Sequence, residues 1–114
     1  MSEKVILTEL KNLGFFTNEH DVETLWAKRI SYYFYPHGLG HYIGNYVHDL
    51  KGDPLFEDQK KQIPKQNIRF CRILEEGMCV TVEPGIYFIK RLLDQAKNDP
   101  AISSVFNWDV VEAY

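Results

Sequence analysis

The chain has 114 residues, a length suited to one domain or to part of one. Its formal net charge of −3 gives no electrostatic reason to expect nucleic acid or an anionic membrane as a partner. No apolar run approaches the roughly 20 residues that span a bilayer, and the N-terminus lacks the pattern of a secretion signal. We therefore expect a cytoplasmic protein, in which Cys71 and Cys79 are reduced, buried packing residues.

Two helices are predicted in the first 30 residues. The first covers residues 3–13, with Gly14 as its stop, because apolar side chains recur there at helical spacing: Val5, Ile6, Leu10 and Leu13. The second opens at Asn18, which together with Asp21 resembles an N-terminal capping arrangement. We expect its apolar stripe to pack against a sheet through Val22, Leu25, Trp26 and Ile30.

A strand is predicted next, followed by a stretch rich in histidine and glycine. Residues 31–35 are mainly aromatic and have high strand propensity. Pro36 then fixes how His37 is presented, and His41 and His48 follow within twelve positions. A zinc-binding His-Glu-x-x-His helix is excluded, because Gly38 stands where that motif needs glutamate.

An extended conformation fits this stretch better, because each glycine would cost a helix about 0.8–1 kcal/mol relative to alanine. On a straight strand His37 and His41 share a face but lie about 13 Å apart, at roughly 3.3 Å per residue. Ligand atoms lie about 2 Å from a metal ion. His37 and His41 are therefore not both expected to bind the same ion.

The second half of the chain holds a candidate carboxylate ligand. A polar surface loop is predicted from Asp49 to Gln66, with a substrate-side lid as its functional alternative. A short strand over 68–74, a turn at 75–77 and a strand over 78–83 follow. Alternation in the last strand places Cys79, Thr81 and Glu83 on one face. Pro84 holds Glu83 extended at the strand end; a helix is predicted over 90–97 and a turn over 98–100.

The sequence contains four separate motifs: Pro36-His37-Gly38-Leu39-Gly40-His41, Val47-His48-Asp49, Gly77-Met78 and Thr81-Val82-Glu83-Pro84-Gly85-Ile86-Tyr87. In their order and spacing, these motifs resemble the prolidase branch of the metallopeptidases that include aminopeptidase P and methionine aminopeptidase. The resemblance covers most of residues 31–100. It implies an α+β, pita-bread fold, in which helices flank a curved antiparallel sheet. It also implies hydrolysis of Xaa-Pro dipeptides with two divalent metal ions, commonly manganese, with zinc or cobalt as alternatives.

The resemblance also assigns roles to individual residues. His41 would be a metal ligand, and Glu83 a second ligand of the same ion and the general base. His37 would line the pocket near the substrate's proline, and His48 would stabilise the scissile carbonyl oxygen. Arg69 would hold the free carboxylate of the dipeptide, a task that suits the planar fork of a guanidinium.

This sequence departs from the family pattern in the remaining ligands. The family site has two aspartates before the histidine and a second glutamate after the first, and neither feature is found in these 114 residues. We therefore expect residues 1–114 to be an incomplete catalytic domain, inactive alone, whose full-length form is a homodimer. The alternatives are an Xaa-Pro aminopeptidase, a pita-bread binding module without catalysis, and a product of a shortened gene that pairs with a sister chain.

Overall fold

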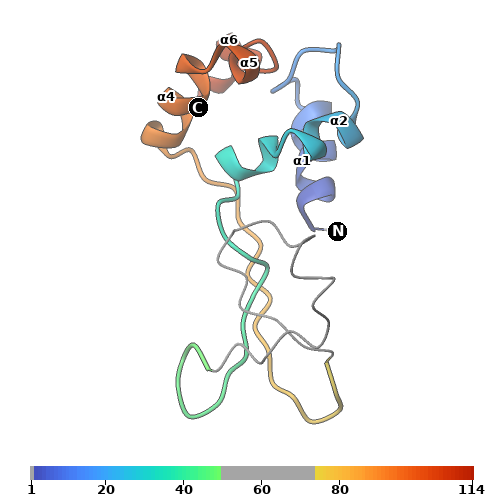
Figure 1. The fold of residues 1–114 in the computed structure, drawn as a ribbon, viewed down its shortest axis with the longest axis vertical. Helices are drawn as coiled ribbons and strands as arrows, with labels where there is room; N and C mark the ends of the chain where they lie inside the picture. Colours follow the sequence, from blue (N-terminus) through green and yellow to red (C-terminus); the bar gives the residue numbers. More distant parts are fainter. Residues whose placement is uncertain (1, 50–73) are drawn as a thin grey trace. The chain divides into compact units, whose positions relative to one another are not determined.

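The computed structural model describes residues 2–49 and 74–114. Within these ranges the helices are, in chain order, α1 (Ser2–Asn12), α2 (Val22–Ala27), the 3-10 helix η1 (Ile30–Tyr33), α4 (Lys90–Asn98), α5 (Pro100–Ser103) and α6 (Trp108–Val111) (Figure 1). The chain divides into two compact units. The helical unit comprises Met1–Pro36 and Gly85–Tyr114, and the histidine unit comprises His37–Pro84. None of the helices within the described ranges combines the length and apolar composition of a membrane span.

Helix α1 ends at the predicted glycine. Gly14 has φ of +82°, a left-handed conformation that is unfavourable for residues with a Cβ. The Gly14 amide donates to the Lys11 carbonyl at 2.9 Å, and the Phe15 amide donates to the Leu10 carbonyl at 3.0 Å. These two bonds form a Schellman motif, so the predicted stop is confirmed. The buried face differs from the predicted stripe, because it consists of Ile6, Leu7 and Leu10.

Helix α2 begins later than predicted. Its N-cap is Asp21 and not Asn18, and Asp21 Oδ1 accepts a hydrogen bond from the Thr24 amide at 2.8 Å. This bond satisfies one of the amides that have no partner inside the helix. Helix α2 packs against α1 and η1, so the prediction that its apolar stripe packs against a sheet is wrong for the described residues.

The segment predicted as a strand over 31–35 contains η1 instead. Arg29, just before η1, has φ of 58°, so the chain turns between α2 and η1 through a left-handed residue. The Phe34 and Tyr35 amides both donate to the Ser31 carbonyl, at 3.0 and 2.7 Å. Phe34 and Tyr35 are fully buried. Burying one such ring stabilises a fold by about 1.5–3 kcal/mol, more than the roughly 1 kcal/mol span of strand propensities.

The core of the helical unit joins its N-terminal and C-terminal segments. Phe16 and Phe106 form an antiparallel bridge, and their ring centroids lie 5.7 Å apart. The Asn107 amide donates to the Phe15 carbonyl at 2.9 Å in the same register. The buried apolar cluster around this bridge consists of Ile6, Leu7, Leu10, Phe15, Phe16, Leu25, Ile30, Phe34, Tyr35, Ala96, Val105, Phe106 and Val111.

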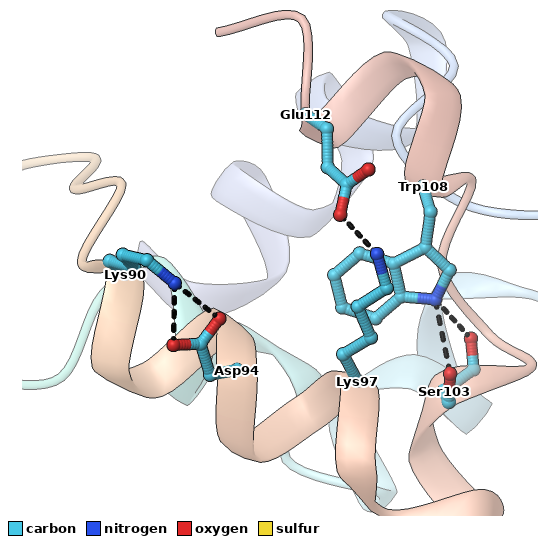
Figure 2. A network of polar contacts seen from close by, with 6 residues as sticks. All are labelled: Lys90, Asp94, Lys97, Ser103, Trp108 and Glu112. Carbon is cyan, nitrogen blue, oxygen red and sulfur yellow. Dashed lines mark hydrogen bonds and ion pairs between the residues drawn. The ribbon is translucent and has the colours of Figure 1, made fainter.

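The C-terminal helices are held together by a tryptophan and an ion pair. The helix predicted over 90–97 is confirmed as α4. Trp108 Nε1 on α6 donates to the carbonyl and the hydroxyl of Ser103, at 3.0 and 3.1 Å (Figure 2). The ammonium of Lys97 lies 5.4 Å from the centre of the Trp108 ring and pairs with Glu112. Where the sequence predicted a turn over 98–100, Pro100 begins helix α5.

The histidine unit contains two extended segments that run side by side, residues 39–43 and 79–83 (Figure 1). The turn predicted at 75–77 is confirmed, since the Met78 amide donates to the Glu75 carbonyl at 3.2 Å and Gly77 has φ of +88°. Pairing among the described residues is limited to isolated bridges, so the predicted curved sheet is not confirmed. Except for their end residues Asp49 and Leu74, the loop predicted from Asp49 to Gln66 and the strand predicted over 68–74 lie outside the described residues, and so do Arg69 and Cys71.

Candidate metal centre

The site is built on the pairing between residues 39–43 and 79–83. Three backbone bonds share one antiparallel register: the amides of Glu83, Thr81 and Ile43 donate to the carbonyls of Leu39, His41 and Cys79, at 2.6, 2.9 and 3.0 Å. Residues directly opposite each other in such a pair present their side chains on the same face. His41 lies opposite Thr81, so Glu83, two residues further on, is its diagonal neighbour.

Gly40 allows the two segments to approach closely. A Cβ at this position would collide with the carbonyl oxygen of Thr81. From the sequence alone, Gly40 is interpreted only as a residue that is unfavourable in a helix. Its structural task is to leave room for the backbone of the facing segment.

The diagonal neighbours His41 and Glu83 meet directly. His41 Nε2 lies 3.0 Å from Glu83 Oε1. The His41 side chain is 8% exposed and that of Glu83 is 50% exposed. The pair therefore has a buried imidazole on one side and a carboxylate open to solvent on the other.

The backbone fixes which nitrogen of His41 faces the carboxylate. His41 Nδ1 lies 2.9 Å from the carbonyl oxygen of Tyr42. A carbonyl only accepts hydrogen bonds, so Nδ1 carries the proton and donates. In the neutral ring Nε2 is then a lone-pair donor atom, as metal-binding histidines require.

Glu83 is held in its ionised form. A hydrogen bond from the Thr81 side chain is the main cause that lowers the pKa of the Glu83 carboxyl below its ordinary value. Desolvation acts in the opposite direction, and the nearby His41 and His37 lower the pKa further. A carboxylate that is a hydrogen-bond acceptor at neutral pH is also an available metal ligand.

The other two predicted histidines lie in the same unit. The His48 ring is 4.6 Å from the His41 ring, centroid to centroid, at an interplanar angle of 79°. His37 Nδ1 lies 2.8 Å from the Gly38 carbonyl oxygen. The structure thus places the His48 ring against the His41 ring. It places His37 near enough to Glu83 to lower the pKa of that carboxyl.

The sequence that carries this arrangement matches a known family. The family description "Metallopeptidase family M24" matches residues 11–110. The chain belongs to metallopeptidase family M24. Metallopeptidases of this family use divalent metal ions, and the match includes both extended segments that carry His41 and Glu83.

Individual M24 relatives match along nearly the whole chain. The chain is 39% identical over 114 residues to "Xaa-Pro dipeptidase" of Rattus norvegicus, covering 100% of this chain and 23% of that protein. It is 38% identical over 117 residues to "Probable Xaa-Pro aminopeptidase pepP" of Botryotinia fuckeliana (strain B05.10), covering 100% and 24%. Identity reaches 44% over 109 residues with "Xaa-Pro dipeptidase" of Xanthomonas oryzae pv. oryzae (strain MAFF 311018), covering 92% and 24%. The chain therefore spans about a quarter of the length of these curated relatives.

The His41–Glu83 pair fits the metal chemistry of M24 peptidases. Two donors bound to one ion at about 2.1 Å each, and at a right angle, lie about 3.0 Å apart. With Nδ1 protonated and Glu83 ionised, Nε2 and Oε1 are two acceptors that repel each other unless a positive charge lies beside both. Either a proton or a metal ion supplies that charge.

The described residues supply only part of a metal shell. In residues 2–49 and 74–114, no group of three or more His, Cys, Asp or Glu side chains is placed to hold a metal ion. Cys79 was predicted to be buried, and this prediction is wrong, because Cys79 is exposed. Within the described residues, the candidate metal ligands are one nitrogen, His41 Nε2, and one oxygen, Glu83 Oε1.

Sequence reasoning missed the contribution of Thr81. The alternation over 79–83 placed Thr81 on the face of Glu83, but no role was assigned to its hydroxyl. In the structure the Thr81 hydroxyl accepts a hydrogen bond from the His41 amide at 2.9 Å. The available signal was the Thr-x-Glu spacing, which places a hydroxyl beside the carboxylate on any extended segment.

Proposed function

We propose that the histidine unit forms part of the active site of a peptidase that hydrolyses Xaa-Pro dipeptides with divalent metal ions. The observation that carries the proposal is the 3.0 Å approach of His41 Nε2 to Glu83 Oε1. Its support from outside the site is the similarity to proteins named Xaa-Pro dipeptidase in rat and in Xanthomonas. The complete site is proposed to lie in the curved sheet of a pita-bread fold.

His41 and Glu83 are proposed to hold one metal ion together. Nδ1 of His41 is tied to the Tyr42 carbonyl, so the ring presents Nε2 without rotating. Manganese, zinc and cobalt all suit a shell of imidazole and carboxylate. When bound, the metal ions supply polarisation of the scissile carbonyl and a lowered pKa for the attacking water.

The protein's own residues would orient the dipeptide and move its protons. Glu83, ionised and half exposed, is proposed to accept the proton of the attacking water. His48, whose ring lies against that of His41, is proposed to donate to the carbonyl oxygen as charge develops on it. His37 is proposed to line the pocket for the substrate's proline. Arg69, outside the described residues, is proposed to pair with the free carboxylate.

An Xaa-Pro aminopeptidase is the second candidate, because the chain is also 38% identical to a protein named as one. The two activities differ at the substrate's C-terminus. A dipeptidase pairs a cation with the free carboxylate that follows proline, whereas an aminopeptidase must leave room for further residues. The assignment of Arg69 to that carboxylate favours the dipeptidase.

The experiment measures proline release from Gly-Pro, and cleavage of Gly-Pro-Ala, with manganese and the complete protein that contains these 114 residues. We expect Gly-Pro to be the better substrate. His41→Ala and Glu83→Gln should each lower kcat/KM by at least about 100-fold, since each removes a metal ligand. Glu76→Gln, outside the pair and exposed, is the matched control and should leave the rate unchanged. Full activity of His41→Ala would refute the proposal, and preferential cleavage of Gly-Pro-Ala would favour the aminopeptidase.

A further inference from the structure

The backbone carbonyl of Tyr42 accepts two hydrogen bonds inside the candidate metal centre. One comes from Nδ1 of the His41 ring, at 2.9 Å, and the other from the Asp49 amide, at 3.2 Å. A carbonyl oxygen has two lone pairs, so these two donors use its full capacity. Tyr42 is buried, and a hydrogen bond in such a low-dielectric environment is stronger than one in water. This oxygen joins the candidate metal ligand to the end of the loop formed by residues 43–48.

The hydrogen bond from Asp49 restrains the backbone of His48. The donated N–H belongs to the peptide group between these two residues, and a peptide group is planar. The Cα of His48 lies in that plane, so the Tyr42 oxygen restrains the atom from which the His48 ring projects. This ring lies 4.6 Å from the His41 ring, centroid to centroid, at an interplanar angle of 79°. One oxygen thus holds His41 through its ring and His48 through its backbone.

We infer that Asp49 is a positioning residue: its amide, bound to the Tyr42 carbonyl, holds the His48 ring at the metal centre. This inference rests on the proposed function, in which His41 binds a metal ion and His48 donates to the scissile carbonyl oxygen. Such a donor is effective only at the position where charge develops, and small displacements of catalytic groups reduce rates strongly. The main chain therefore sets the separation between the metal ligand and the group that stabilises the substrate's oxygen.

The test replaces the Asp49 amide with an ester. Cell-free translation with the corresponding α-hydroxy acid keeps the aspartate side chain and removes the N–H. The control is the same replacement at Tyr46, which is 72% exposed and whose amide donates no hydrogen bond among the described residues. The two esters therefore differ in whether the bond to the Tyr42 carbonyl is lost.

The first measurement is NMR of the 114-residue chain with labelled histidines and without metal. We expect nuclear Overhauser effects between the His41 and His48 rings to be lost in the Asp49 ester and retained in the Tyr46 ester. The proton should remain on His41 Nδ1 in both esters, because that ring keeps its own bond to the Tyr42 carbonyl. The nitrogen chemical shifts of the ring report the position of this proton.

The Ile43 amide distinguishes positioning from a general loss of pairing. It donates to the Cys79 carbonyl at 3.0 Å, and its hydrogen exchange should be unchanged in both esters. If the Ile43 amide loses protection in the Asp49 ester, the bond to Tyr42 merely holds the two extended segments together and the inference is wrong. Ring contacts that survive in the Asp49 ester, or that are lost equally in both esters, would overturn it as well.

The second measurement is hydrolysis of Gly-Pro by the complete protein with manganese. We expect kcat of the Asp49 ester to fall at least about tenfold, because a displaced donor stabilises the developing charge less well. KM should stay within about twofold, since the lost interaction is made in the transition state. The Tyr46 ester should match the unmodified protein, and an unchanged kcat in the Asp49 ester would overturn the inference. If the unmodified protein does not cleave Gly-Pro, the proposed function fails, while the ring contact still decides whether Asp49 positions His48.

Discussion

At the scale of single residues, the pair of His41 and Glu83 was predictable and the support around it was not. Both ligand candidates belong to motifs whose residue types suit metal binding, and alternation placed Glu83 on a defined face. The roles of Gly40 and Thr81 depend on which backbone atoms face them across the pairing. A facing residue cannot be read from one strand alone, since register is set by the partner.

Exposure of Cys79 was also mispredicted, for a related reason. The residue sits in an apolar, strand-like run, which favours burial. It shares the face of Thr81 and Glu83, and that face carries the half-exposed carboxylate. Val82, on the opposite face, is exposed as well, and none of residues 78–83 is buried, so the apolar character of this run does not bury either face.

Gly40→Ala should weaken metal binding without touching either ligand. The new Cβ would collide with the backbone carbonyl of Thr81, which cannot rotate away. We expect manganese affinity, measured by calorimetry, to fall at least about tenfold, in line with other changes that move metal ligands.

Gly44→Ala is the matched control for that substitution. Its Cβ would meet the carboxylate end of the Asp49 side chain, which can turn aside. Neither Gly40 nor Gly44 has positive φ, so both substitutions differ from glycine only in the space they fill. Equal affinities for the two variants would show that close approach at Gly40 does not shape the site.

At the scale of secondary structure, helices with local stop signals were predicted well and the aromatic segment was not. Gly14 ends α1 through two hydrogen bonds within residues 10–15, so the signal is local. Residues 31–35 carry a strand-like composition, but Phe34 and Tyr35 are buried in a core built from distant parts of the chain. Tertiary packing therefore overrides local propensity there.

The cap of α2 predicts a dependence of stability on pH. The hydrogen bond from Thr24 lowers the pKa of the Asp21 carboxyl below its ordinary value of about 3.9. A lowered pKa contributes stability above the ordinary value, and this contribution is lost as pH falls through the folded-state value. We expect Asp21→Asn to lower the Tm at pH 7 and to match the wild type at about pH 2.

Thermal unfolding followed by circular dichroism at both pH values measures this effect. Asparagine is also a good N-cap, so the comparison isolates the charge. The contribution of Glu83 is common to both proteins and cancels in the difference. A Tm difference that stays constant from pH 7 to pH 2 would contradict the assigned cause.

At the scale of the whole molecule, the family was predictable because its motifs are separated and ordered. The matches around His41, His48 and Glu83 fall in one unit, and the helical unit holds the core. The curved sheet could not be confirmed, since the described residues show only isolated bridges. These 114 residues correspond to about a quarter of the length of the relatives. In the proposed function, the remaining strands and metal ligands belong to other parts of the complete protein.

The most direct test of the central claim is paramagnetic broadening of NMR signals by manganese in the 114-residue chain. If His41 and Glu83 hold one ion, low concentrations of manganese should broaden the His41 ring and Glu83 side-chain signals first. Either His41→Ala or Glu83→Gln alone should abolish the broadening at both positions. Broadening centred on other residues, or unaffected by both substitutions, would contradict the claim that this imidazole and this carboxylate form one metal site.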